Sequence, residues 1–443
     1  SYTLGYAKLR TEENENGKPE EKIVGELGIE AKFDKELSGT DGYNYYQKDR
    51  NGYKIAGTKE LTEPAKDGNN IYLTIDASIQ LFVEQAISKA LDKYDADWMT
   101  IMVANAKTGA ILASSTYPTF DPNLRDMTNY LDYNISYAYE PGSTMKIFSY
   151  MATMENGEYN GSEKYTSGVY KTKDGTEIGD WLRSGWGKIT YDQGFALSSN
   201  VGVINLINKH LNGNLLMDYY KKLGFGSKTN IELANEVSGK LAFKYETEVF
   251  NAGFGQGITT TPIQNIKALT SISNNGTLLQ PYIIDKIVDQ NTGKVIYKGK
   301  KKELEKVAST ETVSKIKDLM ESVINGNSRT STGYYYYMDG YDIIAKTGTA
   351  QVARESGKGY YNNQVIRGFA GMFPKDNPEV IMYVAAKNPS STKLMSEVVK
   401  EIVKNTSNYL GIYNGKKEEN KNLTNYTLDS YINNNVDTVK DTL

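Results

Sequence analysis

The strand-like segments of this chain lie far apart in the sequence, and apolar helical segments lie between them. Residues 98–104 and 110–114 are rich in β-formers and flank a turn at 107–109, which is typical of a hairpin. Further strand-like runs come much later, at 341–350, 367–373 and 380–386. Apolar residues at helical spacing predict helices at 79–91, within 140–155, and at 190–208, 215–223, 261–273, 309–324 and 394–408. This order predicts a mixed α and β architecture whose sheet is assembled from distant segments.

Changes in composition divide the chain into three parts. At 443 residues it is too long for one ordinary core. Residues 1–65 are polar and rich in Gly, Lys, Glu and Tyr, which predicts short strands and loops, whereas 66–413 carry the strand and helix pattern. After Tyr413 the chain is Lys-, Glu- and Asn-rich, which predicts a solvated linker within 414–443.

The composition excludes several classes of function. Lys plus Arg is 51 and Asp plus Glu is 54, so the charge balance gives no indication of a nucleic-acid partner. The absence of Cys excludes disulfides, thiolate zinc sites and a cysteine nucleophile. One histidine, His210, excludes most multi-histidine metal sites and leaves a Ser-His-Asp triad a single candidate base. If the chain is a serine enzyme, another base has to be sought.

The first candidate for chemistry is Ser143 with Lys146, directly after the chain-breaking Pro141 and Gly142. Their i, i+3 spacing puts both side chains on one helical face, where the amine can touch the hydroxyl. A serine hydroxyl needs a base to become a good nucleophile, and a lysine at its ordinary pKa of about 10.4 is a poor base at neutral pH. Burial would lower that pKa. Taken alone, the pattern is more typical of a solvated surface helix.

A second candidate is the pair Ser198 and Asn200. A hydroxyl and an amide two residues apart in a loop can point the same way, relay a proton and hold a substrate amide. The alternative is an ordinary helix cap.

A third candidate is Lys346-Thr347-Gly348-Thr349, which ends an apolar strand-like run. On an edge strand, Gly348 would let a substrate backbone approach closely, while the cation and the hydroxyls would bind a carboxylate. The alternative is a plain strand end. Residues 107–109 have the same Lys-Thr-Gly letters, but Ala110 follows, and we interpret them as a hairpin turn.

In this order the three motifs form the signature of penicillin-binding proteins and class A β-lactamases. The chain resembles class B penicillin-binding proteins, and the resemblance covers about residues 70–410. Further family-like segments are Leu73-Thr74-Ile75-Asp76, Phe225-Gly226, Gly255-Gln256-Gly257-Ile258, Thr261-Pro262-Ile263-Gln264 and Asn275-Gly276.

The resemblance implies a penicillin-binding transpeptidase fold of the α+β class, with an antiparallel sheet flanked by helices and an all-helical subdomain. Residues 1–65 would be the last part of the family's N-terminal non-catalytic pedestal module, and 66–413 the transpeptidase domain. Residues 414–443 would be a linker and the start of a PASTA-like module.

The resemblance also implies a D,D-transpeptidase that cross-links peptidoglycan stem peptides and is acylated by β-lactam antibiotics. Ser143 would be the nucleophile and Lys146 its base, while Ser198 and Asn200 would shuttle the proton and hold the substrate. Lys346, Thr347, Gly348 and Thr349 would form the strand that binds the substrate carboxylate, and the backbone N–H groups of Ser143 and Thr349 the oxyanion hole. No metal or organic cofactor is implied.

For location, the resemblance implies a bacterial cell membrane protein with its catalytic domain outside the cytoplasm and a glycosyltransferase partner in the membrane. The sequence contains no signal peptide and no run of about 20 apolar residues. Because it begins abruptly at Ser1, we expect the single N-terminal anchor of the family to precede it.

Two other readings remain open. One is a hydrolase on the same scaffold, either a D-Ala-D-Ala carboxypeptidase or a β-lactamase. Glu232 invites comparison with the deacylating glutamate of class A β-lactamases, although Asn235 follows it by three residues rather than four. The other is a non-catalytic β-lactam sensor or wall-assembly scaffold.

Overall fold

The computed structural model describes residues 1–13, 19–127, 129–354, 359–413 and 416–417. Its centre is a five-stranded antiparallel sheet in the order β16-β17-β18-β6-β7. These strands are Ile344–Ala353, Tyr360–Phe373, Val380–Lys387, Trp98–Asn105 and Ile111–Tyr117. The predicted joining of distant segments is therefore confirmed, because β18 near the end of the chain pairs with β6. The strand that carries the Lys-Thr-Gly-Thr motif, β16, is an edge strand, as predicted.

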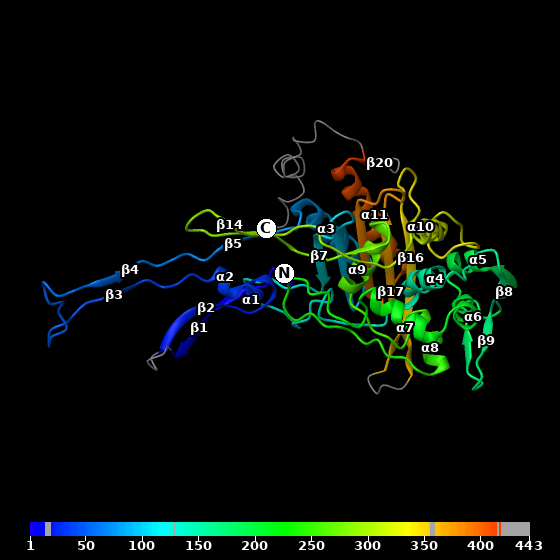
Figure 1. Cartoon of the computed structure of the whole chain (residues 1–443), viewed down its shortest axis with the longest axis horizontal. Helices are drawn as coiled ribbons and strands as arrows, with labels where there is room; N and C mark the ends of the chain where they lie inside the picture. Colours follow the sequence, from blue (N-terminus) through cyan, green and yellow to red (C-terminus); the bar gives the residue numbers. More distant parts are fainter. Residues whose placement is uncertain (14–18, 128, 355–358, 414–415, 418–443) are drawn as a thin grey trace.

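Helices pack around this sheet (Figure 1). Helices α3 (Ala77–Leu91) and α11 (Thr392–Leu410) pack against each other, and α9 (Pro262–Ser273) and α10 (Thr310–Ile324) pack against sheet strands. Asp76 caps α3, because its carboxylate accepts hydrogen bonds from the backbone N–H groups of Ser78 and Ile79. The α+β class predicted from the sequence is thus confirmed.

A helical subdomain lies at one end of the molecule (Figure 1). Its helices are α4 (Lys146–Glu155), α5 (Tyr191–Ala196), α6 (Asn200–His210), α7 (Gly213–Lys222) and α8 (Glu246–Gly253). It also contains strands, so it is not all-helical as predicted: β8 (Lys164–Thr166) pairs with β11 (Lys188–Thr190), and β9 (Val169–Lys171) pairs with β10 (Glu177–Gly179). These two strand pairs lie between α4 and α5 in the chain.

The helix predicted at 190–208 is two helices, α5 and α6, with a break at residues 197–199. Ser198 has φ of 58°, in the left-handed region that no α-helix interior tolerates. Ser199 then caps α6 by accepting a hydrogen bond from the backbone N–H of Gly202. Hydrophobic periodicity missed the break because both helices bury apolar faces in the same core.

The first part of the chain forms an extended arm (Figure 1). It comprises the hairpin β1 (Ala7–Glu13) and β2 (Pro19–Gly25), the short helices α1 (Gly28–Lys32) and α2 (Asp34–Leu37), and the hairpin β3 (Tyr43–Tyr45) and β4 (Leu61–Glu63). The arm joins the large domain through a sheet of β5 (Asn70–Leu73), β13 (Ile284–Val288) and β14 (Val295–Lys298). Of the predicted linker and PASTA-like tail at 414–443, all but Lys416 and Lys417 lies outside the described residues.

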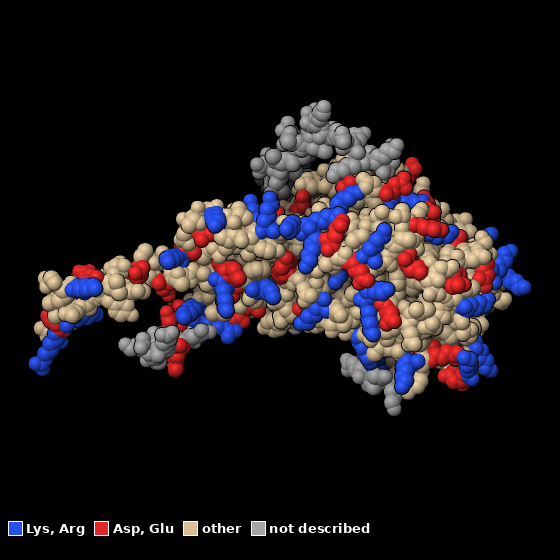
Figure 2. Space-filling model, in the orientation of Figure 1, with Lys and Arg blue, Asp and Glu red and all other residues tan. Residues whose placement is uncertain are grey.

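The remaining elements are small: the 3₁₀ helices η1 (Gly142–Met145) and η2 (Tyr334–Tyr336), and the strand pairs β12 (Thr277–Leu279) with β15 (Glu303–Lys306) and β19 (Ile412–Tyr413) with β20 (Lys416–Lys417). Within the described ranges, no helix has the length and hydropathy needed to span a bilayer. Figure 2 shows cationic and anionic side chains interspersed over the visible face, without the continuous basic stripe that a nucleic-acid backbone would require.

Candidate active site

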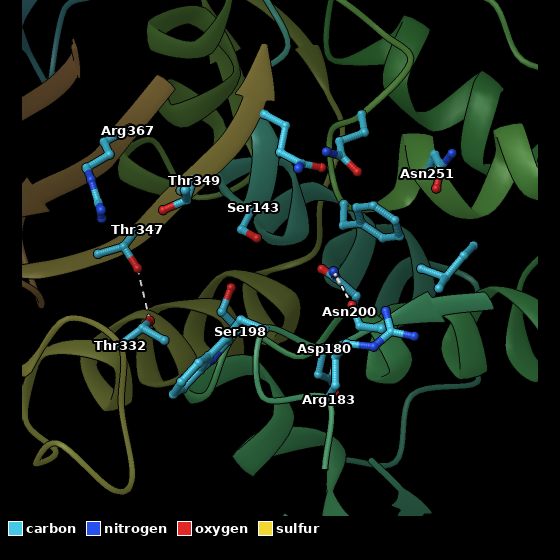
Figure 3. A pocket seen from close by; sticks show the side chains of 18 of the residues that line it. Ser143, Asp180, Arg183, Ser198, Asn200, Asn251, Thr332, Thr347, Thr349 and Arg367 are labelled. Atoms are coloured by element: carbon cyan, nitrogen blue, oxygen red, sulfur yellow. Dashed lines mark hydrogen bonds between the residues drawn. The ribbon is translucent and has the colours of Figure 1, made fainter. Parts of the chain in front are cut away.

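Ser143 lies in η1 and faces a cavity of about 950 Å³, which we call the Ser143 cavity. The cavity is lined from several distant segments, including Ser198, Asn200 and the strand residues Thr347, Gly348 and Thr349. Figure 3 shows Ser143 opposite Ser198, with Thr347 and Thr349 on the adjacent strand. Among the described residues the Ser143 hydroxyl has no hydrogen-bond partner, so it is open to a ligand from the cavity.

The turn that presents Ser143 is held by a close backbone contact with Gly255. The N–H of Gly142 donates to the carbonyl of Gly255 at 3.0 Å. A Cβ added to Gly255, whose φ is +83°, would lie 2.1 Å from the Gly142 oxygen. Real atoms do not approach so closely, so only glycine fits here.

We therefore expect Gly255→Ala to displace η1 and lower the free energy of unfolding by about 3 kcal/mol or more, as overpacking and a positive φ act together. Gly257→Ala is the matched control, because Gly257 also has a positive φ of +73° but its added Cβ would meet nothing within 4 Å. Gly257→Ala should lower the free energy of unfolding by only about 1 kcal/mol. Urea denaturation of both variants tests this, and equal losses would show that the contact with Gly142 is unimportant.

Lys146 begins α4 and is fully buried. Its amine donates to the backbone carbonyl of Ser198 at 2.6 Å and to Oδ1 of Asn200 at 2.8 Å, and lies 3.3 Å from Oγ of Ser198. Burial lowers the pKa of Lys146 to about 7, although the negative charge of Asp180 acts in the opposite direction. A lysine with this pKa is partly neutral at physiological pH and can accept a proton.

The direct contact predicted between Lys146 and Ser143 is not among the hydrogen bonds of the described residues. The 3₁₀ turn does align residues i and i+3, but the Lys146 amine binds across to the turn between α5 and α6. The two strong acceptors, Ser198 O and Asn200 Oδ1, can take both protons of a neutral amine. The nitrogen lone pair then remains available for the proton of a ligand-bound Ser143.

Ser198 and Asn200 come together because the chain turns sharply between α5 and α6. The left-handed conformation of Ser198 turns its carbonyl towards Lys146, and its hydroxyl accepts a hydrogen bond from the amine of Lys346 at 2.9 Å. Strained conformations of this kind persist where the surrounding structure holds them. Ser198, Asn200 and Lys346 thus form one hydrogen-bonded group with Lys146.

Asp180 supports this turn and was not anticipated from the sequence. Its buried carboxylate accepts hydrogen bonds from the Ser199 hydroxyl at 2.8 Å, from the Val201 N–H at 3.0 Å and from the Gly168 N–H at 2.8 Å. It therefore ties the turn to the β9–β10 hairpin. An isolated Asp in a polar segment carries no sequence signal for such a contact.

Lys346 is also fully buried, and its amine donates to Ser198 Oγ and to the carbonyl of Thr347, both at 2.9 Å. Burial and the neighbouring Lys146 lower its pKa well below the ordinary value. Ser198 thus lies between two lysine amines. Such a group can pass a proton from one position to another without a histidine.

The other residues of the strand motif take different positions. The Thr347 hydroxyl shares a hydrogen bond of 2.9 Å with the hydroxyl of Thr332, which the dashed line in Figure 3 marks. Thr349 is exposed at the Ser143 cavity. A Cβ on Gly348 would lie 3.1 Å from both Pro141 O and Thr144 Cγ2. The tight packing of Gly348 against the segment that carries η1 therefore disfavours a larger residue, and the substrate approach predicted from the sequence remains a separate prediction.

Several further residues line the cavity. These are Arg367 on β17 and the aromatic residues Trp181, Tyr334, Tyr335 and Tyr336. Glu232, in contrast, accepts hydrogen bonds from the Ile283 N–H and the Tyr297 hydroxyl and does not line the cavity. Among the described residues, no group of three or more His, Cys, Asp or Glu side chains could hold a metal ion.

Comparison with known families gives two matches. Residues 99–408 match the model described as penicillin binding protein transpeptidase domain, and residues 1–73 match the penicillin-binding protein dimerisation domain.

Among curated proteins, the chain is 34% identical over 435 residues to stage V sporulation protein D of Bacillus subtilis, which covers 95% of this chain and 64% of that protein. It is 28% identical over 401 residues to the probable peptidoglycan D,D-transpeptidase PenA of Neisseria meningitidis, covering 88% of this chain and 65% of that protein. The chain thus spans less than two thirds of the length of these relatives.

Among solved structures, penicillin binding protein 2X from Streptococcus thermophilus is similar with a TM-score of 0.81 at 31% identity, over 92% of this chain and 62% of that one. Penicillin binding protein 3 from Mycobacterium tuberculosis, complexed with ampicillin, has a TM-score of 0.79 over 95% of this chain and 89% of that one, at 23% identity. The second likeness is one of fold alone.

Proposed function

Because this chain belongs to the class B penicillin-binding protein family, we propose that it is a peptidoglycan D,D-transpeptidase that acts through an acyl-enzyme on Ser143. The Ser143 oxygen attacks the carbonyl of the penultimate D-Ala of a stem peptide while Lys146 takes the hydroxyl proton. The C–N bond to the terminal D-Ala then breaks, and its nitrogen receives a proton through Ser198. An amine of a neighbouring strand attacks the ester, forms the cross-link and returns the Ser143 hydroxyl.

One observation carries this proposal: the buried Lys146 amine is held by two acceptors, Ser198 O and Asn200 Oδ1, and both of these residues line the cavity that the Ser143 hydroxyl faces. Desolvation is what turns a lysine into a base. In the proposed roles, Asn200 also holds the substrate amide, and Lys346, Thr347, Gly348 and Thr349 form the carboxylate-binding strand. The N–H groups of Ser143 and Thr349 form the oxyanion hole, where one donor contributes about 3 kcal/mol to lowering the barrier.

The assignment of domains along the chain is also a proposal. We assign residues 66–413 to the transpeptidase domain, 1–65 to the end of the non-catalytic module, and 414–443 to a linker. Stem peptides are the proposed substrates, in line with a relative named as a probable peptidoglycan D,D-transpeptidase, and β-lactams are the proposed inhibitors, in line with a similar structure complexed with ampicillin. We further propose that the whole protein is anchored in the bacterial membrane, works outside the cytoplasm and has a membrane glycosyltransferase as partner.

The rival hydrolytic function receives less support. A β-lactamase of class A type needs a glutamate that directs water onto the acyl-enzyme. Glu232, the candidate from the sequence, is hydrogen-bonded to Ile283 and Tyr297 away from the Ser143 cavity. We therefore expect a long-lived acyl-enzyme with penicillin.

Intact-mass measurement after incubation with benzylpenicillin tests the function. A single stable adduct with the mass of the drug supports a transpeptidase, whereas rapid turnover of the drug indicates a β-lactamase. A second assay supplies a peptide ending in D-Ala-D-Ala together with an amine acceptor. Release of D-Ala with formation of the amide product is expected, and release into water alone would favour a carboxypeptidase. Absence of any adduct would favour the non-catalytic sensor or scaffold.

The proposed base predicts how acylation depends on pH. A protonated amine cannot accept a proton, and the pKa of Lys146 is lowered to about 7. The rate constant of acylation by benzylpenicillin should therefore rise about tenfold per pH unit below pH 7 and level off above it. This profile is measured between pH 5.5 and 9 by quenching the reaction at successive times and determining the fraction of acylated protein by intact mass.

Glu140 supplies the control for this profile, because burial raises its pKa to about 7 as well. Glu140→Gln should retain the rising limb if Lys146 is responsible. A limb that disappears in this variant, or a rate that rises only near pH 10, would contradict the assignment to Lys146.

A further inference from the structure

Arg367 lies on β17 directly opposite Thr349 of the edge strand β16. Residues paired across antiparallel strands point to the same face of a sheet, so Arg367 and Thr349 share a face with Thr347. All three line the Ser143 cavity. Figure 3 shows the guanidinium of Arg367 directed to the side of the cavity where Thr347 lies.

The guanidinium has no counter-ion within the part of the chain that the structure describes. It makes no ion pair there, and its Nε is buried without a hydrogen-bond partner. Its aromatic neighbour Tyr335 is neutral, because burial raises the pKa of that hydroxyl. Arg183, the other arginine of the cavity, differs in this respect because it is paired with Glu177 at 3.0 Å.

A substrate carboxylate bound at this strand needs a positive charge nearby. Lys346 is a weak source of that charge, because its fully buried amine already donates to Ser198 and Thr347 and its pKa is lowered by burial and by Lys146. Arginine stays protonated in proteins and offers a planar pair of donors that fits a carboxylate. An unpaired, partly buried guanidinium lowers the stability of the fold, and a bound carboxylate would supply the missing counter-charge and hydrogen-bond acceptors.

We propose that Arg367 is a specificity-determining residue that binds the free C-terminal carboxylate of the acyl donor, together with the hydroxyls of Thr347 and Thr349. The proposal rests on the function proposed above and assigns the charge that selects substrates with a free carboxylate. Lys346 then acts mainly by positioning Ser198.

Paired ligands test the proposal by acylation. Arg367→Gln should lower the second-order acylation rate constant for benzylpenicillin about 10- to 100-fold, the range of a charge-assisted hydrogen bond. For benzylpenicillin methyl ester, which lacks the carboxylate, the change should be about twofold or less. Arg367→Lys should fall between, because it keeps the charge and loses the planar fork. Lys387→Gln is the control. Lys387 ends the neighbouring strand β18 and is paired with Asp97, so its loss removes a cation outside the cavity and should leave both rate constants unchanged.

A binding measurement separates this proposal from the proposed function. In a Ser143→Ala background, a peptide ending in D-Ala-D-Ala should bind more tightly than its C-terminal amide, and Arg367→Gln should remove that difference. This arm requires no acylation, so an enzyme that fails to react still tests Arg367. Equal losses for acid and ester, or an unchanged preference for the acid over the amide, would overturn the proposal.

Discussion

Ser143→Ala is expected to abolish the covalent adduct with benzylpenicillin and to lower D-Ala release by at least about 10⁴-fold, because in the proposed mechanism the acyl bond forms on the Ser143 oxygen. The hydroxyl faces the Ser143 cavity and has no hydrogen-bond partner among the described residues. Its loss should therefore leave the fold intact. Intact mass and the thermal melting temperature, measured on the same samples, separate the two effects.

The control for this variant is Ser88→Ala, on the exposed surface of α3. It should keep the full adduct, since alanine is well tolerated at an exposed helical position. If Ser143→Ala still acquires the mass of the drug, another residue is the nucleophile and the assignment of the site is wrong.

Lys146→Met is expected to lower the acylation rate about 10³-fold, the contribution of a positioned general base. Methionine fills a similar volume without a basic nitrogen, so the expected loss comes from the missing proton acceptor. The variant should remain folded, because the Ser198 carbonyl and the Asn200 side chain can be hydrated from the cavity that both residues line. The rate is measured by the growth of the adduct mass with time.

Two further variants sharpen this prediction. Lys146→Arg should be about as inactive as Lys146→Met, because a guanidinium stays protonated and cannot serve as a base. Lys267→Met is the matched control: burial lowers the pKa of Lys267 too, but this residue does not line the Ser143 cavity. A Lys146→Met enzyme that acylates at the parental rate would exclude Lys146 as the base.

Much of the fold followed from local patterns. The capped helix α3, the hairpin of β6 and β7 and the strands β16 to β18 were all predicted near their observed positions, because their apolar residues repeat with the period of the element that they form. The break between α5 and α6 was missed, since the left-handed conformation of Ser198 depends on partners from other segments: the amines of Lys146 and Lys346.

The candidate site divides in the same way. Short motifs with fixed spacing identified most of the site residues from the sequence. These are Ser143, Lys146, Ser198, Asn200 and the strand that begins at Lys346. Asp180 and Arg367 could not be identified in this way, because each has a single charged side chain in an unremarkable local sequence. Their roles depend on their tertiary contacts. Asp180 binds the turn at Ser199 and Val201, and Arg367 lines the cavity.

The sequence by itself determined which groups are available for chemistry: two serines, two lysines and an amide in the motifs, with no histidine or cysteine among them. Only the tertiary structure decided their state. Burial lowers the pKa of both lysines, and the Lys146 amine contacts Ser198 and Asn200 rather than Ser143. Desolvation and hydrogen bonding depend on segments far apart in the chain, so no local pattern can encode them.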